Sequence, residues 1–246
     1  MPAAARPRLH FYPLESNPDI FTQLMHNLGV STSLGFSDVL SVDEPDLLAM
    51  IPRPVLALIF IFPTPQDYER LKAEAEEKRP EYRGSGEGED VIWFKQTISN
   101  ACGLHAVLHS VTNGAARSYI QPNSTLSNFL DTAIPLTPKS RAIALEDSKE
   151  IAKAHYDAAT QGSSWMSQNP EDEPDGHYVA FVKSSKNGRM YELYGNHKGP
   201  IDLGSIVPED EDLLCEGALN VVREFIRRDG GRNSGFSLLA LGPSAE

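Results

Sequence analysis

The chain has 246 residues, a formal net charge of −12, two cysteines and an apolar share of 40%. That apolar share is enough for a folded core, and the length allows one large α/β domain or two small ones. The acidic balance argues against nucleic acid as a partner, because its phosphates would be repelled. The charge fits a basic partner, or it serves solubility alone.

Cysteine usage and apolar runs bear on the compartment. Cys102 and Cys215 are too few for a disulfide framework or a zinc cluster. The first eight residues have no apolar signal core, and the longest apolar run, Val55–Phe62, is too short to cross a bilayer. We therefore expect a cytoplasmic protein without a membrane partner. The low cysteine content is equally compatible with the nucleus.

The N-terminal part of the chain predicts two helices. Polar residues at 16–17 supply a cap, Pro18 suits the first helical position, and apolar residues then recur every fourth position from Ile20 until Gly29. This pattern predicts a helix over 18–28, and Pro45–Met50 predicts a second, short one.

The apolar run at 55–62 is bracketed by prolines and predicts a strand buried on both faces. Such a strand requires helices on each side of the sheet that contains it. The Glu- and Lys-rich segment 66–79 predicts a solvated helix, and 84–88 an acidic loop.

The C-terminal half alternates helices and strands without a linker between two halves, which favours a single α/β domain. The predicted elements are a helix ending at Asn113-Gly114, a long helix over 137–159, a loop over 161–176, a hairpin of 177–183 and 189–194, a helix over 208–228 and a strand over 236–241.

The segment from Gln96 to Gly103 has the composition of a nucleophile site. Ser99 or Asn100 can cap a helix starting near Cys102, whose thiol would lie at the positive end of the helix dipole, which favours thiolate. Gly103 would let a substrate backbone approach, and the amide of Gln96 can donate to a developing oxyanion.

His177 heads a strand just after the long loop and can take the proton of the thiol. A cysteine on a helix with a strand histidine downstream is the arrangement of papain-like proteases. Without further information, a buried core cysteine and a surface histidine are the competing interpretations.

Five sequence blocks, in order along nearly the whole chain from Tyr12 to Leu241, carry a family resemblance. They are Tyr12–Pro18, Ile51–Val55, Gln96–Gly103, His177–Val182 and Met190–Gly195. Together they resemble the signature blocks of the ubiquitin C-terminal hydrolases, specifically the small single-domain members.

The resemblance implies an α/β chain of the α+β, papain-like kind, with a central, mostly antiparallel sheet flanked by helices on both faces. It implies one catalytic domain over 1–246 and a thiol protease that cleaves after the C-terminal glycine of ubiquitin, without cofactor or metal. Carried over by position, Gln96 is the oxyanion donor, Cys102 the nucleophile and His177 the general acid and base.

One position departs from the family pattern, because Tyr194 stands where the family has the aspartate that orients the histidine. A phenol accepts a hydrogen bond but carries no charge at neutral pH. Asn196 lies on the same strand face if the strand continues, and an amide can also orient a histidine. We expect Tyr194 or Asn196 as third member; the alternatives are a Cys–His dyad, an inactive ubiquitin-binding protein, or a hydrolase preferring a ubiquitin-like modifier.

The resemblance also assigns substrate contacts, and we expect a monomer. The segment 161–176 corresponds to the crossover loop over the active site, so small adducts and unfolded extensions would be the favoured leaving groups. Acidic residues, Glu15 and Asp19 first and then Asp38, can complement the basic tail of ubiquitin. The predicted substrate-binding residues are Pro13, Leu14, Glu15, Ser16, Asn17, Asp19 and Phe236.

Two further candidates have structural interpretations. His105 and His109 share a helix face, but no glutamate follows the first histidine and no third ligand is evident, so packing is favoured over a metal site. Cys215 lies in an amphipathic stretch and is expected in the core.

Overall fold

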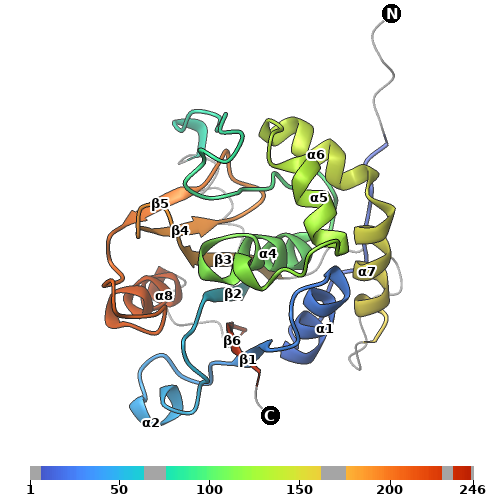
Figure 1. Ribbon diagram of the computed structural model, residues 1–246. Helices are drawn as coiled ribbons and strands as arrows, with labels where there is room; N and C mark the ends of the chain where they lie inside the picture. Colours follow the sequence, from blue (N-terminus) through green and yellow to red (C-terminus); the bar gives the residue numbers. More distant parts are fainter. Residues whose placement is uncertain (1–6, 64–75, 162–175, 229–234, 245–246) are drawn as a thin grey trace, which may run out of the picture.

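The computed structural model describes residues 7–63, 76–161, 176–228 and 235–244, and Figure 1 shows their arrangement around one sheet. In chain order the elements are α1 (Pro18–Leu28), β1 (Leu34–Asp38), α2 (Pro45–Leu48), β2 (Ala57–Pro63), α4 (Cys102–Val111), η1 (Gly114–Tyr119), α5 (Thr125–Ala133), α6 (Pro138–Asp147), α7 (Lys149–Ala159), β3 (Gly176–Lys183), β4 (Met190–Leu193), β5 (Ile201–Gly204), α8 (Glu216–Arg228) and β6 (Ser237–Pro243).

The sheet has six strands in the order β1-β6-β2-β3-β4-β5, and each neighbouring pair is antiparallel. Strand β2 is central, with β6 on one side and β3 on the other. In the register of β2 and β3, Phe62 lies opposite His177. The last strand, β6, lies between β1 and β2, so the two ends of the chain share one sheet.

The central strand β2 is buried on both faces, as its apolar run predicts. Ala57, Ile59 and Ile61 pack in one hydrophobic core, whereas Leu58 and Phe60 pack in the other. Alternation along the strand sends successive side chains to opposite faces. Helices α1, α4, α5, α6 and α7 cover the first face, and α8 lies on the second (Figure 1). The predicted fold class is therefore confirmed.

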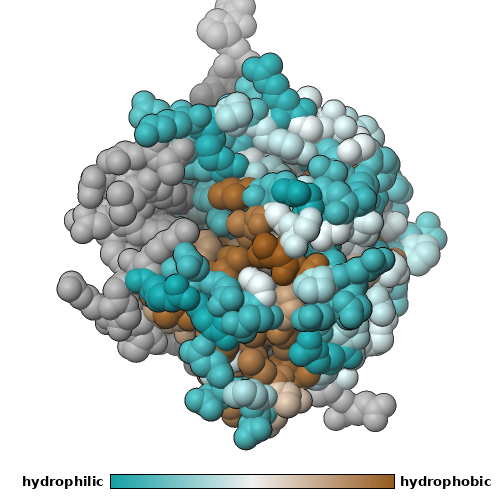
Figure 2. Space-filling view, turned by 90° about the vertical axis from the view of Figure 1, so that its left-hand side faces the viewer, coloured by the Kyte–Doolittle hydropathy of each residue, from teal (hydrophilic) through white to brown (hydrophobic). Residues whose placement is uncertain are grey.

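Apolar side chains also lie at the surface of the protein. Figure 2 shows apolar side chains gathered in a hollowed band on the side that carries β5 and α8, bordered by hydrophilic residues. Among the described residues, no helix has both the length and the apolar character needed to cross a membrane.

Helix α1 matches its prediction because each local signal is used. Asn17 Oδ1 accepts a hydrogen bond from the N–H of Asp19, and Pro18 occupies the first turn. The helix ends at Gly29, which has a φ of 97°, a left-handed conformation that glycine adopts without strain. The hairpin of β3 and β4 is also found where its alternation predicts it.

Two predicted helices have different bounds. The helix expected over 137–159 is two helices, because Ser148 is extended, ends α6 and caps α7 by accepting from the N–H of Ile151. Serine competes for backbone hydrogen bonds in this way and so favours caps over helix interiors. The helix expected from 208 begins only at Glu216, after turns in which Asp212 accepts from the N–H of Leu214.

Four elements were not predicted from the sequence, namely β1, η1, α5 and β5. β1 and β5 are edge strands of five and four residues, and their alternation is too short to distinguish them from loops. Part of the predicted helix over 66–79 and most of the predicted loop over 161–176 lie outside the described residues, at 64–75 and 162–175.

Candidate active site

Cys102 is the first residue of α4, a helix buried along its whole length. The expected cap is wrong: Ala101 is the N-cap residue and makes no side-chain capping bond, while Asn100 adopts a φ of 61°. Asparagine tolerates this left-handed conformation better than most residues, and here it turns the chain into the helix. The amides of the first turn are thereby left to point at the sulfur.

The thiol of Cys102 is 4% exposed, and burial raises its pKa to about 11. Backbone hydrogen bonds from Gly103, Tyr178 and Cys102 itself act in the opposite direction and lower the pKa. The amides at the helix terminus act in the expected direction, toward thiolate, but the loss of hydration outweighs them. A neutral thiol needs a base to become a nucleophile.

His177 lies near the start of β3, and the backbone amide that interacts with the Cys102 sulfur belongs to the following residue, Tyr178. His177 Nδ1 lies 2.8 Å from the phenol oxygen of Tyr194, and the two rings meet edge to face at 5.7 Å between centroids. The ring of Tyr194 is 1% exposed, so this contact is shielded from water. The phenol thus occupies the position from which a third member orients a histidine.

Asn196 has a different place from the one expected for an orienter. β4 ends at Leu193, so the face on which Asn196 was expected does not continue to it. Asn196 is exposed, and its Nδ2 donates to the phenol oxygen of Tyr194 at 3.0 Å. The amide therefore reaches the histidine through Tyr194.

Gln96 is brought to this site by close backbone contact with Gly195. The N–H of Gln96 donates to the carbonyl of Gly195 at 2.8 Å, and a Cβ on Gly195 would lie 2.7 Å from the Cβ of Gln96. Only glycine permits this approach. The side-chain Nε2 donates to the carbonyl of Ile98 at 3.1 Å and keeps a second N–H, while the buried Oε1 has no partner among the described residues.

The segment predicted to contact the substrate is only partly at the surface. Pro13 and Leu14 are buried, and Leu14 Cδ1 lies 2.9 Å from the position that a Cβ on Gly103 would take. Gly103 therefore accommodates Leu14, contrary to the expectation that it admits substrate backbone. The carbonyl of Leu14 accepts from the phenol of Tyr178 at 2.8 Å.

The remaining predicted contacts divide by exposure. Ser16 and Asp19 are exposed, whereas Glu15 and Asn17 are half-buried, and Asn17 caps α1. Burial and then the nearby charge of Asp19 raise the pKa of Asp38, so these two acids form one negative patch.

Phe236 is half-buried and stacks on Phe60, at 5.6 Å between ring centroids, in the core on the α8 face. The structure therefore places most of this side chain in packing. Cys215 is buried, as expected.

The histidine pair of α4 packs in the core. His105 Nδ1 lies 2.8 Å from the carbonyl of Ala101, and His109 Nε2 accepts from the N–H of Phe94 at 3.0 Å. Burial lowers the pKa of His105 to about 4 and that of His109 well below its ordinary value, so both are neutral at pH 7. The described residues contain no group of three or more potential metal ligands.

Two contacts around the site were not predicted from the sequence. The backbone amide of Tyr178 reaches the sulfur, and the indole of Trp93 donates to the carbonyl of Tyr194 at 3.1 Å. Neither leaves a signal in one sequence, because one partner in each contact is a backbone group. The sequence shows only that a tryptophan stands three residues before Gln96.

Comparison with known proteins places this site in a family. The family model described as ubiquitin carboxyl-terminal hydrolase, family 1, matches residues 11–227. The chain is 34% identical to ubiquitin carboxyl-terminal hydrolase YUH1 of Saccharomyces cerevisiae, over 95% of this chain and 96% of that protein. It is 36% identical to a probable ubiquitin carboxyl-terminal hydrolase of Dictyostelium discoideum, over 94% and 88%.

The fold agrees with a solved structure. The catalytic domain of Trichinella spiralis UCH37, bound to ubiquitin vinyl methyl ester, superposes with a TM-score of 0.72 at 24% identity, covering 99% of this chain and 98% of that one. At this identity the likeness establishes the fold. The chain belongs to the ubiquitin carboxyl-terminal hydrolase family, whose members are thiol-dependent cysteine hydrolases.

Proposed function

We propose that this protein is a deubiquitinating cysteine protease that hydrolyses adducts from the C-terminal glycine of ubiquitin. Cys102 is the nucleophile, His177 the general acid and base, and Gln96 a donor to the oxyanion. The observation that carries the proposal is the junction at the start of β3, where the amide after His177 reaches the Cys102 sulfur while the ring of His177 meets Tyr194. Membership of the hydrolase family supports it.

The mechanism begins with a protonated thiol, since burial raises the pKa of Cys102 to about 11. His177 Nε2 takes the thiol proton as sulfur attacks the carbonyl of the ubiquitin C-terminus. The imidazolium then gives this proton to the leaving group, and a thioester remains on Cys102. Water attacks the thioester, with His177 again as base, and releases ubiquitin and the free thiol.

Tyr194 is the proposed third member, with Asn196 behind it. A phenol oxygen has two lone pairs and can accept from two N–H groups. Accepting from Asn196 Nδ2 at 3.0 Å and from His177 Nδ1 at 2.8 Å would keep the proton on Nδ1 and leave Nε2 free as the base. Because a phenol is neutral, it stabilises the imidazolium less than a carboxylate would, and we expect a slower enzyme than relatives with aspartate.

Ubiquitin is the proposed partner, and the acidic patch of Asp19 and Asp38 near α1 suits its basic C-terminal tail. The UCH37 catalytic domain of similar fold is bound to a ubiquitin derivative, which supports this choice. Small adducts and unfolded extensions remain the proposed leaving groups. A monomeric, cytoplasmic enzyme stays a prediction.

The second candidate is a ubiquitin-binding protein with impaired catalysis, and the specific observation in its favour is the phenol where a carboxylate is expected. A hydrolase that prefers a ubiquitin-like modifier is the third. All three predict a folded α/β protein with an intact surface around α1, and they differ in how the protein reacts with ubiquitin.

Reaction with ubiquitin bearing an electrophilic C-terminus tests the proposal, with adducts measured by intact mass. We expect one adduct on the wild type and on Cys215→Ser, the matched control at the second buried cysteine, and no adduct on Cys102→Ala. The wild type should also hydrolyse a ubiquitin C-terminal amide above the rate of Cys102→Ala. Binding without an adduct or turnover would favour the binding protein, and reaction only with a ubiquitin-like probe would favour the third candidate.

A further inference from the structure

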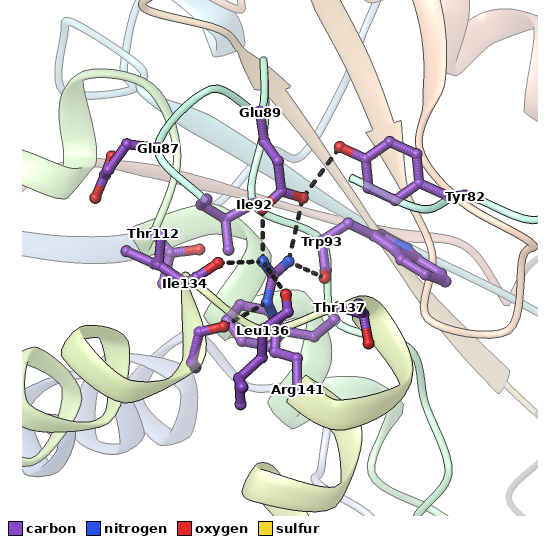
Figure 3. Close-up of polar contacts among 12 residues, drawn as sticks. Tyr82, Glu87, Glu89, Ile92, Trp93, Thr112, Ile134, Leu136, Thr137 and Arg141 are labelled. Carbon is purple, nitrogen blue, oxygen red and sulfur yellow. Dashed lines mark hydrogen bonds and ion pairs between the residues drawn. The ribbon is translucent and has the colours of Figure 1, made fainter. Parts of the chain in front are cut away.

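Arg141, on α6, makes a buried anchor beneath the nucleophile segment (Figure 3). Its side chain is 0% exposed and pairs with the carboxylate of Glu89, with Arg141 Nη2 and Glu89 Oε1 2.5 Å apart. The other acceptors of the guanidinium are the backbone carbonyls of Trp93 at 2.8 Å, Ala133 at 3.1 Å, Ile134 at 3.0 Å and Leu136 at 3.2 Å.

The segment that Arg141 holds, residues 89–98, contains no helix or strand, so side chains from other elements must bind its backbone. Asn113 Oδ1 accepts from the N–H of Ile92 at 2.7 Å, and His109 accepts from the N–H of Phe94. Arg141 binds the carbonyl between these two positions, on Trp93. The segment is therefore fixed up to the point where it delivers Gln96.

Trp93 connects this fixed segment to the histidine side of the site. Its side chain is buried, 1% exposed, and the indole N–H donates to the carbonyl of Tyr194 at 3.1 Å. Three residues later, the N–H of Gln96 donates to the carbonyl of Gly195. Two hydrogen bonds thus join residues 93–96 to 194–195.

Tyr194 lies one residue past the end of β4 at Leu193, and its carbonyl accepts from the indole of Trp93 and from the N–H of His197 at 3.1 Å. Contacts other than the strand ladder therefore help to hold Tyr194, whose phenol must stay within hydrogen-bonding distance of His177. A misplacement of about 1 Å can cost on the order of a hundredfold in rate.

We infer that Trp93 is a positioning residue for the hydrolysis reaction: anchored by Arg141 through its carbonyl, it holds Tyr194 so that the phenol orients His177. The inference rests on the proposed function, because it acts through Tyr194. The orientation of His177 then depends in part on the buried Arg141–Glu89 pair, and the hydrogen-bond partners of Arg141 among the described residues include neither Cys102 nor His177.

A double-mutant cycle tests the inference with Trp93→Phe, Tyr194→Phe and the double variant, all measured on hydrolysis of a ubiquitin C-terminal amide. The control is Tyr191→Phe, on β4, which removes a phenol from a buried residue; this phenol accepts from Asn187 Nδ2 at 2.8 Å and donates to Asp90 Oδ2 at 3.4 Å. Assays are run well below the lowest melting temperature, and Trp93→Tyr replaces Trp93→Phe if the latter does not fold.

We expect Trp93→Phe to lower kcat about tenfold with KM unchanged, and to move the acidic limb of the pH profile of kcat/KM, which reports His177. In the Tyr194→Phe background the same change should have almost no further effect. Tyr191→Phe should keep wild-type kcat.

Four results would overturn the inference. They are wild-type kcat and pH profile in Trp93→Phe; full additivity with Tyr194→Phe; an equal loss of kcat in Tyr191→Phe; or no effect of Tyr194→Phe itself. The last result is recognised from the single variant alone, and it would remove the role of Tyr194 in the proposed function rather than the contact of Trp93.

Discussion

Two buried polar regions of this protein differ in how their groups are satisfied. Around Arg141 and Glu89, the guanidinium meets a carboxylate and four carbonyls, and the phenol of Tyr82 donates to Glu89 at 3.0 Å. Around Cys102, a buried thiol has its pKa raised by burial, and Gln96 Oε1 has no partner among the described residues.

The first region stabilises the fold, whereas the second is the proposed reaction site. In the Arg141 cluster the charged guanidinium and the charged carboxylate both have hydrogen-bond partners, so the cluster stabilises one arrangement of the chain. The site around Cys102 keeps groups in an unfavourable state that a substrate can relieve, as functional sites commonly do. Trp93 belongs to both regions, because its carbonyl faces Arg141 and its indole faces Tyr194.

The largest expected effect comes from removing the cation of the buried Arg141–Glu89 pair. Arg141→Met leaves Glu89 buried without its cation, and we expect a loss of about 3–5 kcal/mol in the free energy of unfolding, measured in urea. The matched control is Arg189→Met, whose pair with Asp202 is about 40% exposed on each side and should contribute little. Equal effects in the two variants would show that burial of the Arg141 pair is unimportant.

The next largest effect concerns the pH dependence of stability and a buried histidine, His155, that contacts the backbone of Tyr12. His155 is buried, and burial lowers its pKa to about 4; its Nε2 lies 2.8 Å from the carbonyl of Tyr12. Because the folded pKa is depressed, its contribution to stability is present above pH 6.5 and is lost as the pH falls toward 4.

We expect the wild type to lose on the order of 2–3 kcal/mol from this histidine between pH 7 and 4.5. His155→Gln keeps a donor for Tyr12 but does not titrate, so its urea stability should fall less steeply over this range. An identical fall in both proteins would assign the acid sensitivity to other groups, such as His105, whose pKa is also lowered to about 4.

Tyr194→Phe tests the proposed reaction site, because it removes only the phenol oxygen that lies 2.8 Å from His177 Nδ1. We expect kcat to fall about 10- to 100-fold, because His177 loses the partner that fixes its tautomer. Stopped-flow or plate hydrolysis of a ubiquitin C-terminal amide measures this. A variant with wild-type kcat would favour the Cys–His dyad.

Asn196→Ala gives the smallest expected effect. This amide is exposed and touches the phenol rather than the histidine, so we expect kcat to fall only about two- to threefold. The same hydrolysis assay measures the change. A loss as large as that of Tyr194→Phe would mean that Asn196 orients His177 more directly than this structure indicates.

Much of the fold follows from local signals that the sequence carries. The cap and Pro18 define the start of α1, and the apolar run of β2 predicts a strand covered on both faces. These predictions work because the signals lie within one element. The break at Ser148 and the short edge strands β1 and β5 were missed, since a cap inside a long helical pattern and a strand of four or five residues depend on their neighbours.

The sequence by itself determined which residues are proposed to carry the chemistry: the motif around Cys102, the histidine at 177 and the departure at Tyr194 are all visible in it. Only the tertiary structure decided their states. Burial, which raises the pKa of Cys102 to about 11, depends on how α4 packs against β3. The contacts of Tyr194 with His177, and of Trp93 with Tyr194, join residues 17 and 101 positions apart, and no local pattern specifies such pairs.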